Sequence, residues 1–114
     1  MKKKYIVKNS RDFEKIIKEG KCKKNKSFII HSKKNDLNYD KYGISVSKKL
    51  GNAVVRNHQK RLIRQVFTKY KSEIQSFDIF VIARHNSISL TYSEVESNIA
   101  YLIKKIGILN KENK

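Results

Sequence analysis

The sequence has 114 residues, a formal net charge of +17 and a pI near 10.1. A chain of this length folds as one domain with a modest core, so we assign residues 1–114 to a single domain. A globular protein this basic repels itself and suits a polyanionic partner, which favours nucleic acid. No apolar run approaches the length of a membrane-spanning helix, so we exclude a membrane protein.

Nothing in the sequence indicates export. The first residues, Met1 to Lys4, are basic like the start of a signal peptide, but Lys8 and Arg11 follow without an apolar segment. Cys22 is the only cysteine, which excludes an internal disulfide and a cysteine-based metal site. We therefore expect a cytoplasmic protein, with a disordered tail over about 110–114.

A short helix is predicted near the start of the chain. Asn9 or Ser10 can cap it and Gly20 can end it. Phe13 and Ile17 are four residues apart, so they share one face of this helix. Apolar residues at that spacing are normally buried, and packing on the core is the simplest interpretation of the pair.

A first strand is predicted over residues 27–32. Side chains alternate along a strand, so Phe28 and Ile30 should face one side, and Ile29 and His31 the other. A basic turn should lead into this strand. It contains Lys21, Lys23, Lys24 and Lys26.

A polar loop from Lys33 to Lys41 follows the strand. It contains Asp36 and Asp40, but two carboxylates without further ligands are a weak metal site, so we expect the protein alone to bind no metal. Apolar and small side chains then alternate over residues 42–47, which predicts a second strand with one buried face.

A long helix is predicted from Ala53 to Tyr70, because Asn52 is a favoured N-cap and neither glycine nor proline interrupts the stretch. At about 100° per residue, the apolar side chains fall on one arc and the cations on the next. The charged face comprises Arg56, Asn57, Lys60, Arg61 and Arg64. No acidic residue occurs between Asp40 and Glu73. Solvated helix faces normally mix charges, so this face favours phosphate binding.

Lys48 and Lys49 come directly before this helix. The first amides of a helix are unpaired donors with a partial positive charge. We therefore predict that a backbone phosphate of a nucleic acid is held by these two lysines and the amides after Gly51.

The second half of the chain should complete a mixed fold. An apolar run from Phe77 to Ala83 predicts a central strand covered on both faces, and strand, helix, strand implies a parallel crossover. Arg84 would lie just beyond that strand. Thr91 and Glu94 match a capping box before a closing helix. The core-facing stripe of that helix comprises Val95, Ile99, Leu102, Ile103 and Ile106, and Gly107 can terminate it.

The residues around Gly51 resemble the signature of the bacterial ribonuclease P protein family. The matching residues are Ser45-Val46-Ser47-Lys48-Lys49, Gly51-Asn52-Ala53-Val54, Arg56-Asn57 and Lys60-Arg61-Leu62-Ile63-Arg64. They span about twenty residues, with weaker agreement over almost the whole chain. The family usually has arginine after the Arg-Asn pair, where this chain has His58.

This resemblance implies an α+β fold. It is a two-layer α/β sandwich in the order α-β-β-(β)-α-β-α, with a parallel β-α-β crossover of the rare left-handed form. General rules make such crossovers right-handed in about 98% of cases, so the family overrides the rule here.

The resemblance also implies a function. The protein would be a subunit of the endoribonuclease ribonuclease P, which hydrolyses one phosphodiester to remove the 5′ leader from precursor tRNA. The chemistry and most of the Mg²⁺ would belong to the RNA subunit. The partners would be ribonuclease P RNA and precursor tRNA, with no small-molecule substrate and a monomeric free protein.

Two sets of site residues follow from the resemblance. The first helix and the sheet would form a cleft for the leader, and the long basic helix would bind the catalytic RNA. The leader set is Phe13, Ile17, Ile29, His31, Ser45 and Arg84. The catalytic-RNA set is Lys48, Lys49, Asn52, Arg56, Asn57, His58, Lys60, Arg61 and Arg64.

Two other functions remain open. A ribosomal or other structured-RNA-binding protein would share the charge and the fold. A free-standing nuclease would cut without an RNA subunit, but the ten acidic residues are scattered. His31, His58 and His85 fall in three different predicted elements, so no acid–base pair is recognisable.

Overall fold

The computed structural model describes residues 10–37, 39–70, 74 and 76–108. Its helices are α1 (Ser10–Glu19), α2 (Ala53–Lys69) and α3 (Tyr92–Ile106). Its strands are β1 (Lys21–Lys24), β2 (Phe28–Lys34), β3 (Lys41–Val46) and β4 (Phe77–Ala83), and two 3₁₀ turns are η2 (Lys48–Leu50) and η3 (His85–Ser89). The predicted α+β class is confirmed. The predictions of a cap at Asn9 and a tail over about 110–114 lie outside the described residues.

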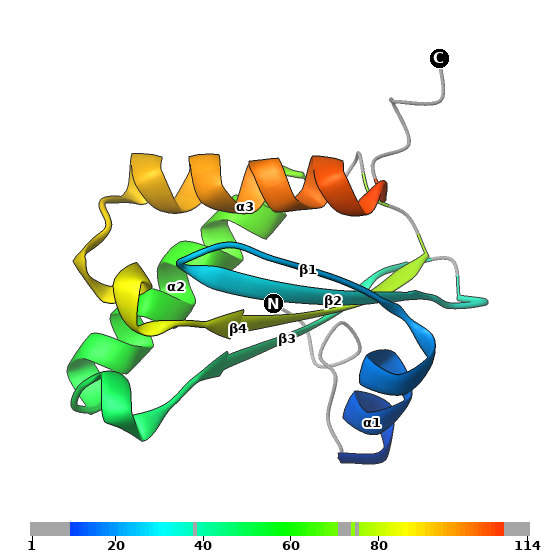
Figure 1. The fold of residues 1–114 in the computed structure, drawn as a ribbon, viewed down its shortest axis with the longest axis horizontal. Coiled ribbons are helices and arrows are strands. Elements are labelled where there is room, and N and C mark those ends of the chain that lie inside the picture. Colours follow the sequence, from blue (N-terminus) through cyan, green and yellow to red (C-terminus); the bar gives the residue numbers. More distant parts are fainter. Residues whose placement is uncertain (1–9, 38, 71–73, 75, 109–114) are drawn as a thin grey trace.

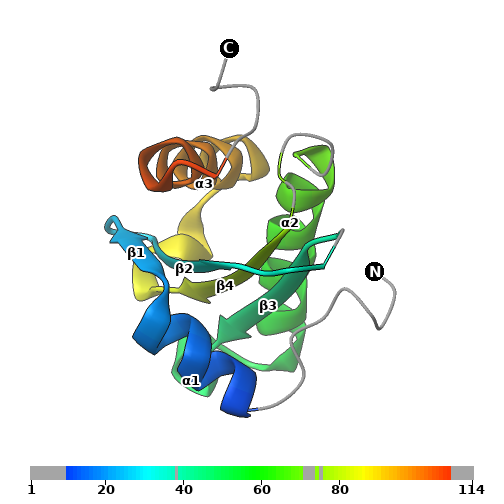
Figure 2. The same ribbon diagram turned by 90° about the vertical axis from the view of Figure 1, so that its right-hand side faces the viewer.

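The four strands form one mixed sheet in the order β1-β2-β4-β3. β4 pairs antiparallel with β2 and parallel with β3. α2 and α3 lie over one face of this sheet, and α1 lies against the other face (Figures 1 and 2). Two helices, α2 and α3, therefore cover one face of the sheet, whereas the opposite face is covered only where α1 crosses it.

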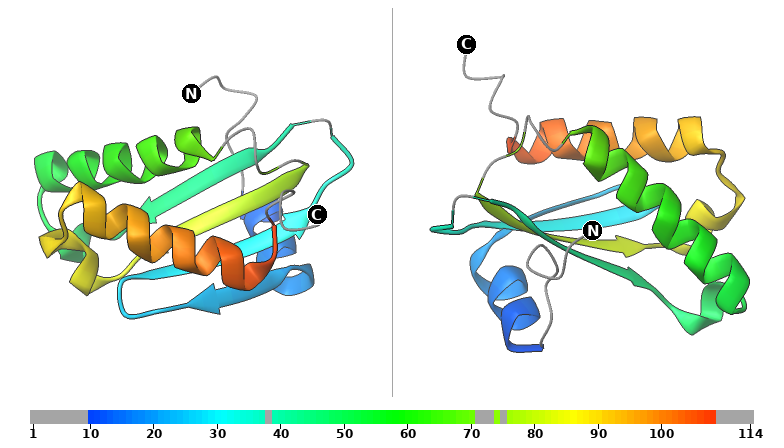
Figure 3. Two further views of the ribbon diagram at one scale, coloured as in Figure 1. Left: turned by 90° about the horizontal axis from the view of Figure 1, so that it is seen from above. Right: turned by 180° about the vertical axis from the view of Figure 1, so that it is seen from behind.

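The β3-α2-β4 crossover is left-handed. Seen from the side of α2 and α3, β3 and β4 both point to the left, and β4 lies below β3 (left panel of Figure 3). Turned so that the strands point upward, β4 lies to the left of β3, which is the mirror image of the usual right-handed unit. The hand inferred from the family resemblance therefore holds against the general rule.

The main core lies between the sheet and the pair α2 and α3. β4 contributes Ile79, Val81 and Ala83 to it, all of them buried. Phe80 and Ile82 point to the opposite face, where they pack with Phe13 and Ile16 of α1. The predicted central strand is thus confirmed, although Ile82 is only half-buried, because α1 covers part of that face.

The helix ends follow the predicted chemistry. Asn52 Oδ1 accepts a hydrogen bond from the Val55 amide at 3.0 Å and caps α2. Thr91 and Glu94 form a complete capping box at the start of α3. Gly107 ends α3 in the left-handed conformation, with φ of 78°. No helix in the described ranges is long and apolar enough to cross a membrane.

The predicted basic turn over Lys21–Lys26 is wrong for its first four residues. Lys21–Lys24 is an edge strand, β1, which pairs antiparallel with β2 from Lys21 opposite Ser32 to Lys24 opposite Ile29. All four of its residues are exposed, so it carries no apolar alternation for a sequence pattern to detect. Lysines on an edge strand also discourage pairing with a second sheet.

Gly20 connects α1 to β1 at a point of very close approach. A Cβ atom there would lie 2.1 Å from the Ser32 carbonyl oxygen and 2.6 Å from that of Ile16. Backbone atoms cannot yield as a flexible side chain can. Gly20→Ala should therefore lower the free energy of unfolding by about 1–3 kcal/mol through overpacking, measured by urea denaturation. The control is Lys15→Ala, an exposed site on the same helix. Equal midpoints for the two variants would contradict this account.

Candidate nucleic-acid interface

The sheet face that carries α1 presents rows of side chains drawn from all four strands. The pairing register aligns Cys22, His31, Phe80 and Gly43 in one row. The next row, toward the carboxyl ends of β3 and β4, contains Lys24, Ile29, Ile82 and Ser45. We call the solvent-accessible part of this face, together with the adjacent side of α1, the α1-side surface.

Phe13 and Ile17 play different parts in this surface. The Phe13 ring packs on Phe80 with centroids 4.1 Å apart, and Phe13 is half-buried. Gly43 makes room for this contact, because a Cβ there would lie 2.8 Å from Phe80 and 3.2 Å from Phe13. Ile17, by contrast, is 51% exposed. Core packing therefore explains Phe13 in part, but it does not explain Ile17.

His31 lies in the row next to Phe80, on the face predicted for it. Its Nε2 atom is 4.0 Å from Cys22 Sγ. Its Nδ1 atom is buried and has no hydrogen-bond partner within the described part of the chain. Burial lowers the pKa of the His31 imidazole below its ordinary value. The neutral ring is therefore favoured near pH 7, and a neutral flat ring suits stacking better than charge pairing.

The basic face of α2 points to solvent as predicted. Asn57, His58, Arg61 and Arg64 are exposed, whereas Arg56 and Lys60 are half-buried. Arg56 Nε donates to the Gly51 carbonyl oxygen at 3.2 Å, which fixes this side chain at the helix start. The helix thus carries one cation held by a hydrogen bond, Arg56, and others that are exposed to solvent.

Gln59 was missed by the sequence analysis, although at about 100° per residue it falls in the apolar arc of α2, between Val66 and Tyr70. It is buried, at 2% exposure, and its Nε2 donates to the Ser87 carbonyl oxygen at 3.3 Å. This contact ties α2 to η3. The helical period, which puts Gln59 on the same side as Ile63 and Val66, was the signal that could have predicted its burial.

Lys48 and Lys49 lie before Gly51 and the Asn52 cap, as predicted, and not in α2 itself. They form η2, a 3₁₀ turn in which Ser47 Oγ accepts from the Lys49 amide at 3.2 Å. Both lysine side chains are exposed. Asn52 uses its side-chain oxygen as the α2 cap, so only its amide nitrogen is left for an RNA contact. The two lysines therefore lie just before the N-terminus of α2, near its first amides.

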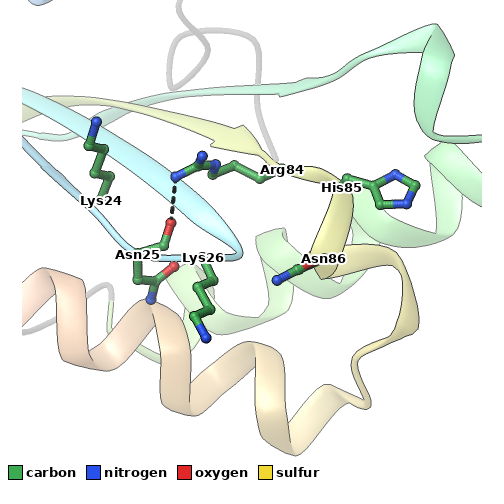
Figure 4. Close-up of a pocket in the computed structure, with 6 residues that line it drawn as sticks. All are labelled: Lys24, Asn25, Lys26, Arg84, His85 and Asn86. Carbon is green, nitrogen blue, oxygen red and sulfur yellow. Dashed lines mark hydrogen bonds between the residues drawn. The ribbon is translucent and has the colours of Figure 1, made fainter.

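Arg84 and the β1–β2 turn meet at the end of the sheet. Arg84 Nη1 donates to the Asn25 carbonyl oxygen at 2.9 Å, and its backbone amide donates to the Ser27 carbonyl oxygen at 2.8 Å. An open depression of about 530 Å³ lies at this junction (Figure 4). It is lined by Lys24, Asn25, Lys26, Arg84, His85 and Asn86. We call it the sheet-end depression.

The predicted residues therefore fall on two surfaces. Ile29, His31 and Ser45 share the α1-side surface with Phe13, and Ile17 is exposed one turn further along α1. The α2 cations lie across the sheet from them, because α2 covers the opposite face (Figure 2). Arg84 and η2 both follow the carboxyl ends of the parallel strands, so they connect the two surfaces along one sheet end.

The carboxylates that the structure describes do not form a metal site or line the sheet-end depression. Asp40 is buried and accepts from the Tyr42 hydroxyl at 3.1 Å and from the Phe77 amide at 2.9 Å. Glu96 forms an ion pair with Lys69, which links α3 to α2. In the described ranges no three His, Cys, Asp or Glu side chains are grouped closely enough to hold a metal ion. No acidic side chain lines the sheet-end depression.

Comparisons with known proteins agree on one family. The Ribonuclease P family model matches residues 1–107. The ribonuclease P protein component of Macrococcus caseolyticus is 46% identical over 112 residues, which cover 97% of each chain. That of Staphylococcus epidermidis is 43% identical over 115 residues, which cover 100% of each chain.

Solved structures show the same likeness. The RNase P protein of Staphylococcus aureus aligns with a TM-score of 0.87 at 38% identity, covering 93% of this chain and 98% of that chain. The RNase P protein of Thermotoga maritima, solved in complex with 1-(4-fluorophenyl)-2-thiourea, aligns with a TM-score of 0.78 at 38% identity. It covers 84% of this chain and 94% of that chain.

Proposed function

Because the chain belongs to the ribonuclease P protein family, we propose that it binds the catalytic RNA and the 5′ leader of precursor tRNA. In this proposal it assists Mg²⁺-dependent endonucleolytic removal of the leader, in the cytoplasm and as a monomer when free. One observation carries the proposal. Two surfaces of different chemistry, a cationic helix face and a mixed apolar and polar sheet face, are joined by cations at one sheet end.

The α2 face would bind the catalytic RNA mainly through phosphates. Arginine presents a planar fork that matches phosphate oxygens, and Arg61 and Arg64 are exposed on adjacent turns. Lys48 and Lys49 stand before the helix start, where unpaired amides and the helix dipole favour an anion. His58 stands where the family usually has arginine, and its ring lacks the five-donor fork of a guanidinium.

The α1-side surface would bind the leader through its bases. Single-stranded RNA exposes base faces and edges that stack on rings and pack on apolar side chains. His31 offers a neutral ring, Ile29 and Ile17 offer apolar surface, and Ser45 offers a hydroxyl. Such contacts tolerate many sequences, which suits a leader that differs from one precursor tRNA to another.

The proposal assigns the reacting groups to RNA. The donor set of the described residues fits this assignment, because its carboxylates are dispersed and Asp40 and Glu96 already have partners. The Mg²⁺ ions would be held mainly by the RNA subunit and would supply Lewis-acid catalysis there. The protein's own part is to bind, orient and neutralise phosphate charge where the two RNAs meet.

Cleavage of precursor tRNA at low Mg²⁺ by a bacterial ribonuclease P RNA, with and without this protein, tests the proposal. Cleavage at the mature 5′ end should appear or accelerate only when both components are present. Cleavage by the protein alone would instead reveal a free-standing nuclease. RNA binding without stimulation would favour the structured-RNA-binding alternative.

Replacing Lys48 and Lys49 by glutamate should abolish tight binding to the catalytic RNA. Each lost contact to a charged phosphate is worth at least about 1.5 kcal/mol, so two correspond to a loss of roughly 100-fold. Filter binding at fixed ionic strength measures it. The control reverses the charge of Lys34 and Lys104, two exposed lysines on β2 and α3. Equal affinity of the two variants would overturn this phosphate site.

Ile17→Phe should tighten binding of precursor tRNA to the holoenzyme. A ring at this exposed position can stack on a leader base, and such stacking is worth about 1–3 kcal/mol. The gain should vanish for mature tRNA, which has no leader. Ile17→Leu, which keeps an aliphatic side chain of equal size, is the control and should leave affinity unchanged. An equal gain with mature tRNA would show that Ile17 does not face the leader.

A further inference from the structure

The β1–β2 turn is held more firmly than an exposed turn of lysines would be by itself. Asn25 Oδ1 accepts from the Ser27 amide at 2.9 Å and the Phe28 amide at 2.8 Å. Asn25 Nδ2 donates to Asn98 Oδ1 of α3 at 3.1 Å. Asn25 thus uses both ends of its side-chain amide, and it anchors the turn to the sheet and to α3.

The same turn also positions Arg84. The Asn25 carbonyl oxygen in this turn accepts a hydrogen bond from Arg84 Nη1, so the guanidinium lies against the turn. A guanidinium has five N–H donors, and this bond uses one of them. The side chain is exposed, so the remaining donors can reach a ligand (Figure 4).

Charge at this place has one sign. Lys24 and Lys26 are exposed on either side of Asn25, and Arg84 and His85 follow the end of β4. Lysines and arginine gather here without a carboxylate in the lining, although each repels the others. A bound polyanion would relieve this repulsion.

The depression also continues the α1-side surface. Lys24 lies in the same register row as Ile29, Ile82 and Ser45, which runs across all four strands. Arg84 follows Ile82 by two residues on β4. A strand of RNA that lies on this row would therefore pass directly into the depression.

We propose that the sheet-end depression is a second phosphate-binding site for single-stranded RNA, formed by Lys24, Lys26 and Arg84. It binds the sugar-phosphate backbone of the precursor-tRNA leader as the leader leaves the α1-side surface. The inference rests on the proposed function, and it adds the β1–β2 turn to the residues predicted to contact RNA. An open depression lined by cationic and amide residues suits a flexible backbone better than an enclosed small molecule.

The test uses the holoenzyme reconstituted with ribonuclease P RNA, and it compares two double variants of equal net charge. Lys24→Ala with Lys26→Ala removes two lysines of the depression and leaves the Asn25 and Arg84 contacts intact. Lys34→Ala with Lys104→Ala removes two exposed lysines elsewhere, neither of which has a partner among the described residues. Equal urea midpoints for the two variants establish that both are folded.

The readout is binding of precursor tRNAs whose leaders lengthen from a single nucleotide, measured over a range of salt concentrations. For long leaders the Lys24 and Lys26 variant should show a salt slope shallower by roughly 1.4, about 0.7 for each lost phosphate contact. For the shortest leader it should match the control. Identical slopes for both variants at every leader length would overturn the proposal.

Three further outcomes show which RNA the depression binds and which of the two proposals is wrong. If the Lys24 and Lys26 variant instead loses affinity for the catalytic RNA alone, the depression binds that RNA, and the leader assignment is wrong. If the unsubstituted protein does not stimulate cleavage, the proposed function itself is wrong. If it stimulates cleavage but the Lys24 and Lys26 variant shows no defect, only the proposed second phosphate-binding site is wrong.

Discussion

The position of β4 between β2 and β3 is the constraint on which the rest of the molecule depends. Its two faces carry different cores, with Ile79 and Val81 under α2 and α3 and Phe80 under α1. Its parallel pairing with β3 also brings the carboxyl ends of both strands to one end of the sheet. Its antiparallel pairing with β2 places Arg84 and η3, which follow the end of β4, beside the β1–β2 turn.

The two faces of the sheet therefore differ: one carries the apolar core, and the other carries part of the proposed RNA-binding surface. The face under α2 and α3 buries an unbroken apolar core, which supplies most of the favourable free energy of folding. The opposite face is covered only in part by α1, and half-buried side chains such as Ile29 and Ser45 remain accessible there. A chain with net charge +17 bears considerable self-repulsion, and none of the Lys and Arg side chains that the structure describes is buried in the core.

Polar contacts fix the proposed RNA-binding surfaces where apolar packing does not reach. Asn25 joins the β1–β2 turn to α3 and Arg84, and Gln59 joins α2 to η3. Neutral hydrogen bonds of this kind contribute about 1 kcal/mol each, so their main effect is on geometry. They hold exposed cations at defined places, which reduces the conformational entropy that an RNA complex would otherwise lose.

The sequence by itself determined the features that arise from local chemistry. The caps at Asn52 and Thr91 depend only on neighbouring residues, and the basic face of α2 depends only on the helical period. Both predictions were correct. The strand alternation of Phe28 and Ile30 against Ile29 and His31 was likewise correct. The left-handed crossover came from the family resemblance, because no local rule predicts its hand.

Only the tertiary structure decided which distant residues meet. β1 has no apolar pattern, so its pairing with β2 comes from backbone hydrogen bonds that a pattern of side chains does not encode. The packing of Phe13 on Phe80, and the hydrogen bond from Arg84 to the Asn25 carbonyl oxygen, join residues far apart in the chain. Such contacts depend on sheet order and register, which are set by the packing of the whole molecule rather than by any one segment.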